Sequence, residues 1–437
     1  MITAKHSNVM LSLLAGLLSG AILACTEDDP QATPSPDSGT PDTGDAGDAG
    51  GATDTTDAGE DPDAEVPDTD ATVEPGTSDV NDTGTGPDSD ADTVPDADAA
   101  EDTDADAVEP DPEPGFECER PASDFTPGAD DDWPTCSPDS GEYVRFQESV
   151  STIARIDAYE QMAVLLWDSP DAPTPDDFIA ARELYATDEG LGSRVSRRED
   201  EHYPPVTNSE GTILLCRDEG VPALDPDRCV GPAKIVPLIN DAFAAGITGT
   251  DPEINAAQLD AALVWFLYAS TYKEGVTCTT VKRDCDSSWA YFAGGTQSDE
   301  APRGLARLFD EAEALSYEIT YDGVLAVRCW RDNDSADTAT DLVRRDQALD
   351  QLDRGLDGGM AAIVVKRATE ARTSTGVQRQ ADWLWIQIVA GALDRALGEV
   401  SPTAASALRD ALAQTDAASA DLDAVIDAVQ ALYPCQP

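Results

Sequence analysis

Ninety consecutive residues of this chain, 26–115, contain 30 aspartates and glutamates but no lysine, arginine or aromatic residue. The stretch consists almost entirely of Asp, Thr, Ala, Gly, Pro, Ser and Glu. It has too little apolar surface to offset the entropy of ordering, and its like charges repel one another. We therefore predict that residues 25–115 form a disordered acidic linker and that a folded domain occupies residues 116–437.

The first 24 residues have the pattern of a bacterial export signal. A short basic start precedes an apolar run over 9–24, whose 16 residues are few for a membrane span and typical of a signal peptide. The run ends in Ile-Leu-Ala followed by Cys25, which resembles the lipobox of bacterial lipoproteins. This resemblance implies cleavage after residue 24 and acylation of Cys25. The alternative is an ordinary secretory signal with a chance cysteine.

An acylated Cys25 would make the membrane a partner of this chain. Each buried methylene adds about 0.8 kcal/mol, so two or three acyl chains hold a protein firmly on a bilayer. Thr26 follows the cysteine, and in such lipoproteins the absence of Asp at that position favours the outer membrane. We expect an outer-membrane lipoprotein, facing the periplasm or the cell surface, with residues 25–115 as its tether.

The charge excludes several partner classes. The formal net charge is −60, and residues 116–437 alone carry 57 acids and 26 bases, a net charge of −31. Nucleic acids and anionic lipid surfaces require clusters of Lys and Arg, so we expect neither as a partner. Alternating aspartates over 88–92 and 102–106 suggest calcium loops, but the turn glycine and the closing glutamate are missing at the required offsets.

Helix signals recur throughout residues 116–437. Apolar residues at helical spacing predict a helix over 143–167, and Thr174-Pro175-Asp176-Asp177 has the cap, proline and first-turn acids of a helix that runs to about Tyr185. Gly246 is a natural stop for a helix over 235–245. Further helices are predicted from 251 onward and over 299–318, 341–371, 378–398, 402–414 and 418–432, the last but one with a Ser-Pro start.

Strand patterns are scarce, since 212–215 and 321–329 are the only short candidates. The predicted fold class is therefore all-α, a multi-helix bundle with disulfides. A group of aromatic residues could line a ligand cleft, but we interpret it as core, together with Trp383 and Trp385. The members of the group are Trp265, Phe266, Tyr268, Tyr272, Trp289, Tyr291 and Phe292.

Nine cysteines are present, and Cys25 belongs to the lipobox. An even number of cysteines in an exported domain indicates disulfides, whereas a zinc site is disfavoured by the absence of Cys-x-x-Cys. Pairing nearest neighbours gives 118–136, 216–229, 278–285 and 329–435, although spacing alone leaves the connectivity open. The eight predicted disulfide cysteines are Cys118, Cys136, Cys216, Cys229, Cys278, Cys285, Cys329 and Cys435.

No complete catalytic motif occurs in the chain. Ser270 and Lys273 match Ser-x-x-Lys, but the accompanying Ser-Asp-Asn and Lys-Thr-Gly are absent, as are nucleophile elbows, zinc-protease helices and phosphate-binding loops. We expect no enzyme. The alternative is a carboxylate-based hydrolase of envelope glycans, for which two catalytic acids cannot be chosen from sequence.

The most unusual segment of the domain is Arg197–Tyr203. It brings together carboxylates, a phenol and the one histidine that remains after export, a set that iron accepts. The alternative is a charged segment in which Arg197 and Arg198 neutralise the acids. As candidate metal ligands we name Glu199, Asp200, Glu201, His202 and Tyr203.

Three segments resemble the low-iron-inducible periplasmic protein family. They are the run 235–246, the aromatic helix 259–274 and the sequence Asp-Ser-Ser-Trp-Ala-Tyr-Phe-Ala-Gly-Gly over 286–295. The resemblance implies an exported, acidic, helical protein associated with iron assimilation, without an attached activity. A weaker similarity to imelysin-type iron-uptake proteins lacks their Gly-x-His-x-x-Glu motif.

The sequence thus predicts a lipid-anchored envelope protein with a helical domain that binds iron or another cation. Two alternatives stay open: a hydrolase of envelope glycans, and a structural or adhesive surface module.

Overall fold

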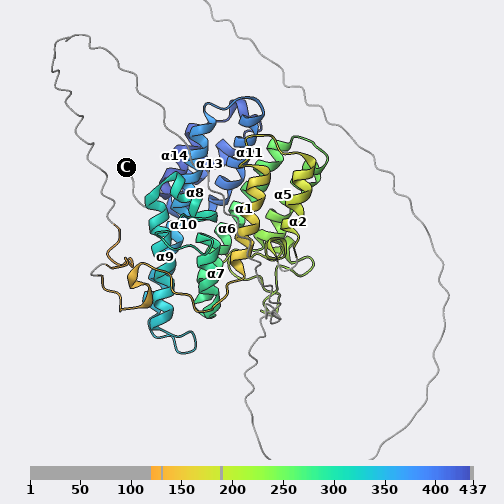
Figure 1. Cartoon of the computed structure of the whole chain (residues 1–437). Helices are drawn as coiled ribbons and strands as arrows, with labels where there is room; N and C mark the ends of the chain where they lie inside the picture. Colours follow the sequence, from red (N-terminus) through yellow and green to blue (C-terminus); the bar gives the residue numbers. More distant parts are fainter. Residues whose placement is uncertain (1–119, 129–130, 188–189, 434–437) are drawn as a thin grey trace, which may run out of the picture. The chain divides into compact units, whose positions relative to one another are not determined.

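The computed structural model describes residues 120–128, 131–187 and 190–433, all within the second of the chain's two compact units, Asp104–Pro437. These residues form 14 α-helices and four short 3-10 or π turns, and the described ranges contain no strand (Figure 1). Thr207 and Ile213 make an isolated antiparallel bridge. The all-α prediction is confirmed for this part of the chain.

The helices follow one another closely along the chain. Their bounds are η1 Ser137–Ser140, α1 Thr152–Leu166, α2 Pro175–Tyr185, α3 Leu191–Val195, α4 Val221–Leu224, η2 Gly231–Ile235, α5 Val236–Ile247, α6 Pro252–Cys278, α7 Lys282–Ala293, α8 Gly304–Ala312, α9 Ala314–Asn333, α10 Leu342–Ala371, α11 Gly376–Ala392, α12 Asp394–Val400, α13 Pro402–Leu412, η3 Ala417–Ser419, α14 Leu422–Val429 and η4 Gln430–Leu432.

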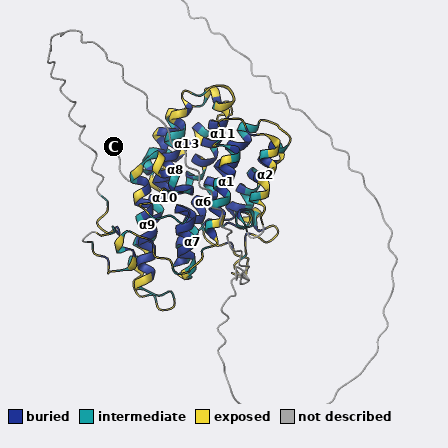
Figure 2. Cartoon of the chain, in the orientation of Figure 1, coloured by how far each residue is buried: buried dark blue, intermediate teal, exposed yellow. Residues whose placement is uncertain are grey.

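Helix α6 is the central element of the bundle. It packs against α5, α7, α10 and α11, and nearly every residue over 255–271 is buried (Figure 2). A helix that is buried on all sides needs small and apolar residues around its whole circumference, which explains the run of Ala, Leu, Val and aromatic residues here. The aromatic group predicted to be core is core: its members are buried, except for the half-buried Trp265 and Tyr272.

Two predicted helix starts are confirmed by their caps. The Thr174 hydroxyl accepts from the Asp177 backbone N–H, and the Asp177 carboxylate accepts from the Thr174 backbone N–H, which completes a capping box before α2. The Ser401 side chain likewise accepts from the Ala404 N–H before α13.

Other predictions from the sequence were wrong. Residues 321–329 are not a strand but the middle of α9, because their aromatic and β-branched side chains are buried within the helical core. The helix predicted over 235–245 is present as α5, but Gly246 is its last residue but one and not the stop. A Cβ at Gly246 would come within 2.3 Å of the Phe178 ring, so its role is close packing. The first helix begins at Thr152, not at 143.

Helices α9 and α10 approach each other closely at two glycines, one on each helix. A Cβ on Gly323 would lie 2.6 Å from Leu352 Cα, and a Cβ on Gly355 would lie 2.8 Å from Thr320 Cα. Both obstacles are backbone atoms, so no side-chain rotation could make room.

Gly355→Ala is therefore expected to lower the free energy of unfolding by about 1–3 kcal/mol, since the two helices must separate. The matched control is Gly391→Ala in α11, where no atom lies within 4 Å of the added Cβ. There the better helix propensity of Ala should raise stability by about 0.5–1 kcal/mol. Urea unfolding curves measure both, and equal shifts for the two variants would contradict the close-packing role.

Three disulfides lie within the described residues: Cys136–Cys329, Cys216–Cys229 and Cys278–Cys285. The pairs 216–229 and 278–285 confirm the nearest-neighbour prediction. The pairs 118–136 and 329–435 are wrong, because α9 carries Cys329 next to the segment that leads into η1.

Several predictions fall outside the described residues. These are the signal peptide 1–24, the acylated Cys25, the whole linker 25–115, and the cysteines at 118 and 435. Within the described part, no helix combines the length and the apolar character that crossing a membrane requires.

Candidate functional site

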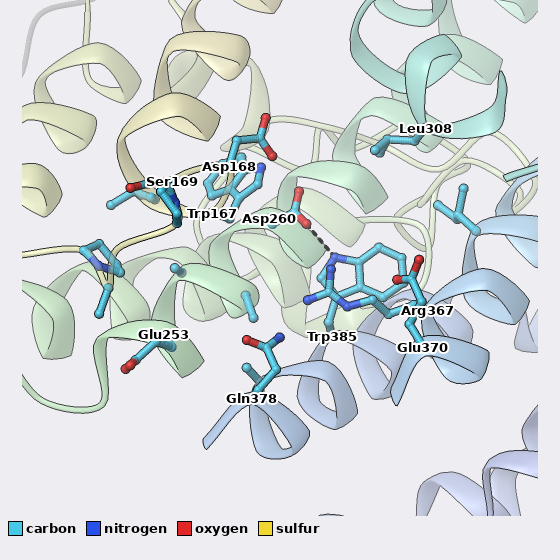
Figure 3. Close-up of a pocket in the computed structure, with 18 of the residues that line it drawn as sticks. Trp167, Asp168, Ser169, Glu253, Asp260, Leu308, Arg367, Glu370, Gln378 and Trp385 are labelled. Carbon is cyan, nitrogen blue, oxygen red and sulfur yellow. Dashed lines mark hydrogen bonds between the residues drawn. The ribbon is translucent and has the colours of Figure 1, made fainter. Parts of the chain in front are cut away.

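A pocket of about 380 Å³ opens at the N-terminal end of α6 (Figure 3). Its walls come from the end of α1 and the loop that follows, from the first turns of α6, and from α8, α10 and α11. The volume falls within the roughly 300–1,000 Å³ that is typical of small-molecule clefts. Segments far apart in the sequence therefore meet here around one cavity.

Asp260 is the most deeply placed polar group of this pocket. It is 6 % exposed, and its two oxygens each accept a hydrogen bond, Oδ1 from the Tyr159 hydroxyl at 3.1 Å and Oδ2 from Trp385 Nε1 at 2.7 Å. Burial raises the pKa of the Asp260 carboxyl, although the charge of Arg367 and the two hydrogen bonds act in the opposite direction. Asp260 thereby ties α1, α6 and α11 together at the pocket.

The cationic side chains that line the pocket are paired with acids. Arg307 of α8 lies 3.4 Å from Glu311 and 3.6 Å from Asp168. On α10, Lys366 pairs with Glu370, and Arg367 Nε lies 2.8 Å from Asp382. The pocket wall therefore carries donors and acceptors side by side, with little unmatched positive charge.

Two tryptophans lie on either side of Asp260 (Figure 3). Trp385 is 4 % exposed, and the Arg367 guanidinium lies 5.4 Å from its ring centroid, so this ring serves mainly as wall. Trp167 is half-buried and follows α1 directly, with its ring centroid 5.7 Å from that of Tyr159. Trp167 is thus the better placed of the two rings to contact a ligand.

Besides the buried Asp260, two acids at the pocket have no ion pair with any described residue. They are Asp171, in the loop after α1, and Glu253, in the first turn of α6. Their carboxylates are exposed or half-exposed, so they can accept hydrogen bonds from an incoming molecule.

The segment over 199–203, chosen as a metal site from the sequence, lies elsewhere, and its side chains separate into two groups. Glu199 and Glu201 both bind the buried Arg228, at 2.7 and 2.8 Å from its Nη2. The same guanidinium also donates to the backbone carbonyls of Asp200 and Tyr203. Arg228 therefore folds the segment around itself and neutralises its glutamates without a metal.

His202 and Asp200 belong to the second group. His202 Nδ1 lies 2.5 Å from Asp200 Oδ1, and Nε2 lies 2.8 Å from Asp353 Oδ1 of α10. The imidazole is 3 % exposed and stacks on the Tyr272 ring with centroids 3.8 Å apart. Burial opposes the charge, but hydrogen bonds and charges from Asp200 and Asp353 outweigh it and raise the pKa of His202 to about 9.

This group continues into α12. The Tyr268 hydroxyl donates to Asp357 at 2.6 Å, and Arg395 lies within ion-pair distance of Asp353 and Asp357, at 3.6 and 3.4 Å. Burial and the neighbouring charge of Asp353 raise the pKa of Asp357 to about 7. Four segments of the chain meet in this network, which fastens the segment over 199–203 to the bundle.

The described residues contain one group with the geometry of a three-ligand metal site, Cys136, Asp139 and Cys329. The two sulfurs of this group are joined in a disulfide, so it offers no thiolate. Metal binding by residues 199–203 stays a prediction, and their contacts already give these side chains a structural role.

Comparisons with protein-family models, with curated proteins and with solved structures find no match for this chain.

The pocket was not predicted from the sequence, although one of its residues carries a signal that could have indicated it. Asp260 interrupts an otherwise apolar and small-residue helix, and a charged residue in such a helix is rarely buried without a partner. That signal singles out Asp260. Its partners, Tyr159 and Trp385, are 101 and 125 residues away and could not be assigned from spacing.

Proposed function

We propose that this chain is a lipoprotein of the cell envelope whose helical domain binds a small ligand in the pocket at the start of α6. The acylated Cys25 would anchor it to the outer membrane, and residues 25–115 would hold the domain away from the lipid. The observation that carries the binding role is the cavity of about 380 Å³ with a half-buried tryptophan and a buried carboxylate in its wall.

Binding is favoured over catalysis by the state of Asp260. Both of its oxygens already accept hydrogen bonds from protein groups, so the carboxylate positions Tyr159 and Trp385. A glycan hydrolase needs two carboxyl groups that are free to act on opposite sides of the scissile bond. Asp260 is held by Tyr159 and Trp385, so it is poorly suited to be one of them.

A thermal-shift screen tests the binding role. The probes are a library of sugars, amines, amino acids and carboxylic acids, and a ligand of the folded state raises the melting temperature by mass action. The obstructing variant is Gln378→Trp, at an exposed position of the pocket rim. We expect at least one probe class to stabilise the wild type and not this variant. Equal shifts in both proteins would place the binding elsewhere and contradict the proposal.

The anchor has its own test. Cys25→Ala is expected to abolish acylation, so the protein should leave the membrane fraction or keep its signal peptide uncut. Fractionation and mass spectrometry of the N-terminus measure both. A correctly processed variant that still partitions with the membrane would show that Cys25 is not the anchor.

Iron or another cation is the second candidate ligand. The unpaired Asp171 and Glu253 at the pocket and the net charge of −31 over residues 116–437 favour it. The test is calorimetric titration with ferric citrate at about 0.15 M salt. Salt at this concentration screens diffuse electrostatic attraction beyond about 8 Å, so the binding that remains comes from specific ligands. Glu253→Gln tests the pocket, and Glu199→Gln and His202→Ala test the segment over 199–203. If the wild type and the three variants bind iron equally, neither the pocket nor the segment over 199–203 is the iron site.

A further inference from the structure

We infer that the pocket takes a neutral, hydroxyl-rich ligand, a saccharide, with one sugar ring packed on Trp167. This inference rests on the proposed binding role of the pocket and names the class of its ligand.

The charges at the pocket disfavour an anion, and the spacing of its acids disfavours a tightly bound metal ion. Arg307, Lys366 and Arg367 are each within ion-pair distance of a carboxylate, so none of the described cations of the pocket wall lacks an acidic partner. The acidic domain and linker would also repel an anion. Among the described residues, the pocket acids do not converge into a three-ligand group of the kind that a metal requires.

The polar groups of the wall match hydroxyl chemistry. A sugar hydroxyl donates one hydrogen bond and accepts others, so it is best met by a wall that offers both kinds of partner. Here the carboxylates of Asp168 and Glu253 can accept, while the guanidinium of Arg307 can donate. Ion pairs at the rim, such as Arg307 with Asp168, present donor and acceptor at neighbouring positions without net charge.

Trp167 supplies the apolar contact. One face of a sugar ring carries C–H groups, whose weak positive charge suits the negative face of an aromatic ring. Trp167 is half-buried and lines the cavity, whereas Trp385 is covered by Arg367. In Figure 3 Trp167 and Asp168 lie together on one side of Asp260, so stacking and hydrogen bonding would act on the same ring.

The test is calorimetric titration of the purified lipoprotein in detergent. N,N′-diacetylchitobiose and cellobiose are the neutral probes, spermidine is the cationic probe and citrate is the anionic probe. We expect a neutral sugar to bind, and Trp167→Ala and Glu253→Gln each to weaken it about tenfold or more. The controls Trp265→Ala and Glu183→Gln change the same residue types outside the pocket and should bind as the wild type does.

The outcomes separate this inference from the proposed function. Binding of spermidine or citrate alone, lost in Trp167→Ala, overturns the saccharide class but keeps the pocket as a binding site. Sugar binding that both pocket variants retain overturns the site. No binding of any probe, together with no stabilising compound in the thermal-shift library, overturns both. Gln378→Trp provides a second pocket variant if Trp167→Ala does not fold.

Discussion

Replacing Cys136 and Cys329 together by serine is expected to lower the free energy of unfolding by about 5 kcal/mol. This disulfide joins residues 193 positions apart, so it restricts the unfolded chain strongly. In the chain-entropy description the stabilisation grows with the logarithm of the closed loop. Guanidinium unfolding of the purified protein without reductant measures the effect.

The matched control is Cys278→Ser with Cys285→Ser. This pair closes a separation of 7 residues and should cost only about 2 kcal/mol by the same relation. Each double variant also places two serines at buried or half-buried positions, so the difference between them isolates the loop length. Equal losses in the two variants would show that local packing, and not restriction of the unfolded chain, sets the contribution of the long disulfide.

The free energy of unfolding is expected to fall by about 3 kcal/mol between pH 6.5 and 9 as His202 loses its proton. The folded state raises the pKa of His202 from 6.5 to about 9, so over this interval the folded protein binds the proton and the unfolded chain does not. The stabilisation by His202 is therefore complete below pH 6.5 and is lost as the pH rises through 9. Urea unfolding at a series of pH values measures the slope.

Two variants separate the contributions within this network. His202→Gln should remove the slope between pH 6.5 and 9. Folding raises the pKa of Asp357 from 3.8 to about 7, so this carboxyl is harder to ionise in the folded protein. The free energy of unfolding should therefore fall as the pH rises from 3.8 to about 7. Asp357→Asn should therefore flatten the profile below pH 7 and leave the alkaline slope unchanged. A His202→Gln protein with the wild-type alkaline slope would contradict the assignment.

The local features of the domain could be predicted from the sequence. The cap at Thr174, the Ser-Pro start before α13 and the short cysteine pairs 216–229 and 278–285 all act between neighbours in the chain. Such interactions depend on a few adjacent residues, so their pattern is visible in the sequence itself. The absence of strands from the described residues follows for the same reason, because helical periodicity recurs throughout the domain.

The failed predictions have one physical cause, which is packing between segments that are distant in the sequence. At Gly246 the sequence resembles a helix stop. In the structure the Phe178 ring lies so close to this position that only a residue without a side chain fits. In the segment 321–329 the tertiary environment buries residues that favour strands, and burial outweighs their weak backbone preference. Metal binding by Glu199 and Glu201 is not one of these failures and stays a prediction, but their ion pairs with Arg228, 29 and 27 residues further on, also come from tertiary packing.

The sequence by itself determined the acidic composition of residues 26–115 and the helical character of the described part of the domain, since these depend on composition and local periodicity, whereas the export signal over 1–24 stays a prediction. Only the tertiary structure decided that Cys136 pairs with Cys329, that His202 lies between Asp200 and Asp353, and that Asp260 meets Trp385 beside a cavity. Each of these contacts joins helices whose relative placement comes from packing of the whole core, and no local pattern specifies which side chains that packing brings together.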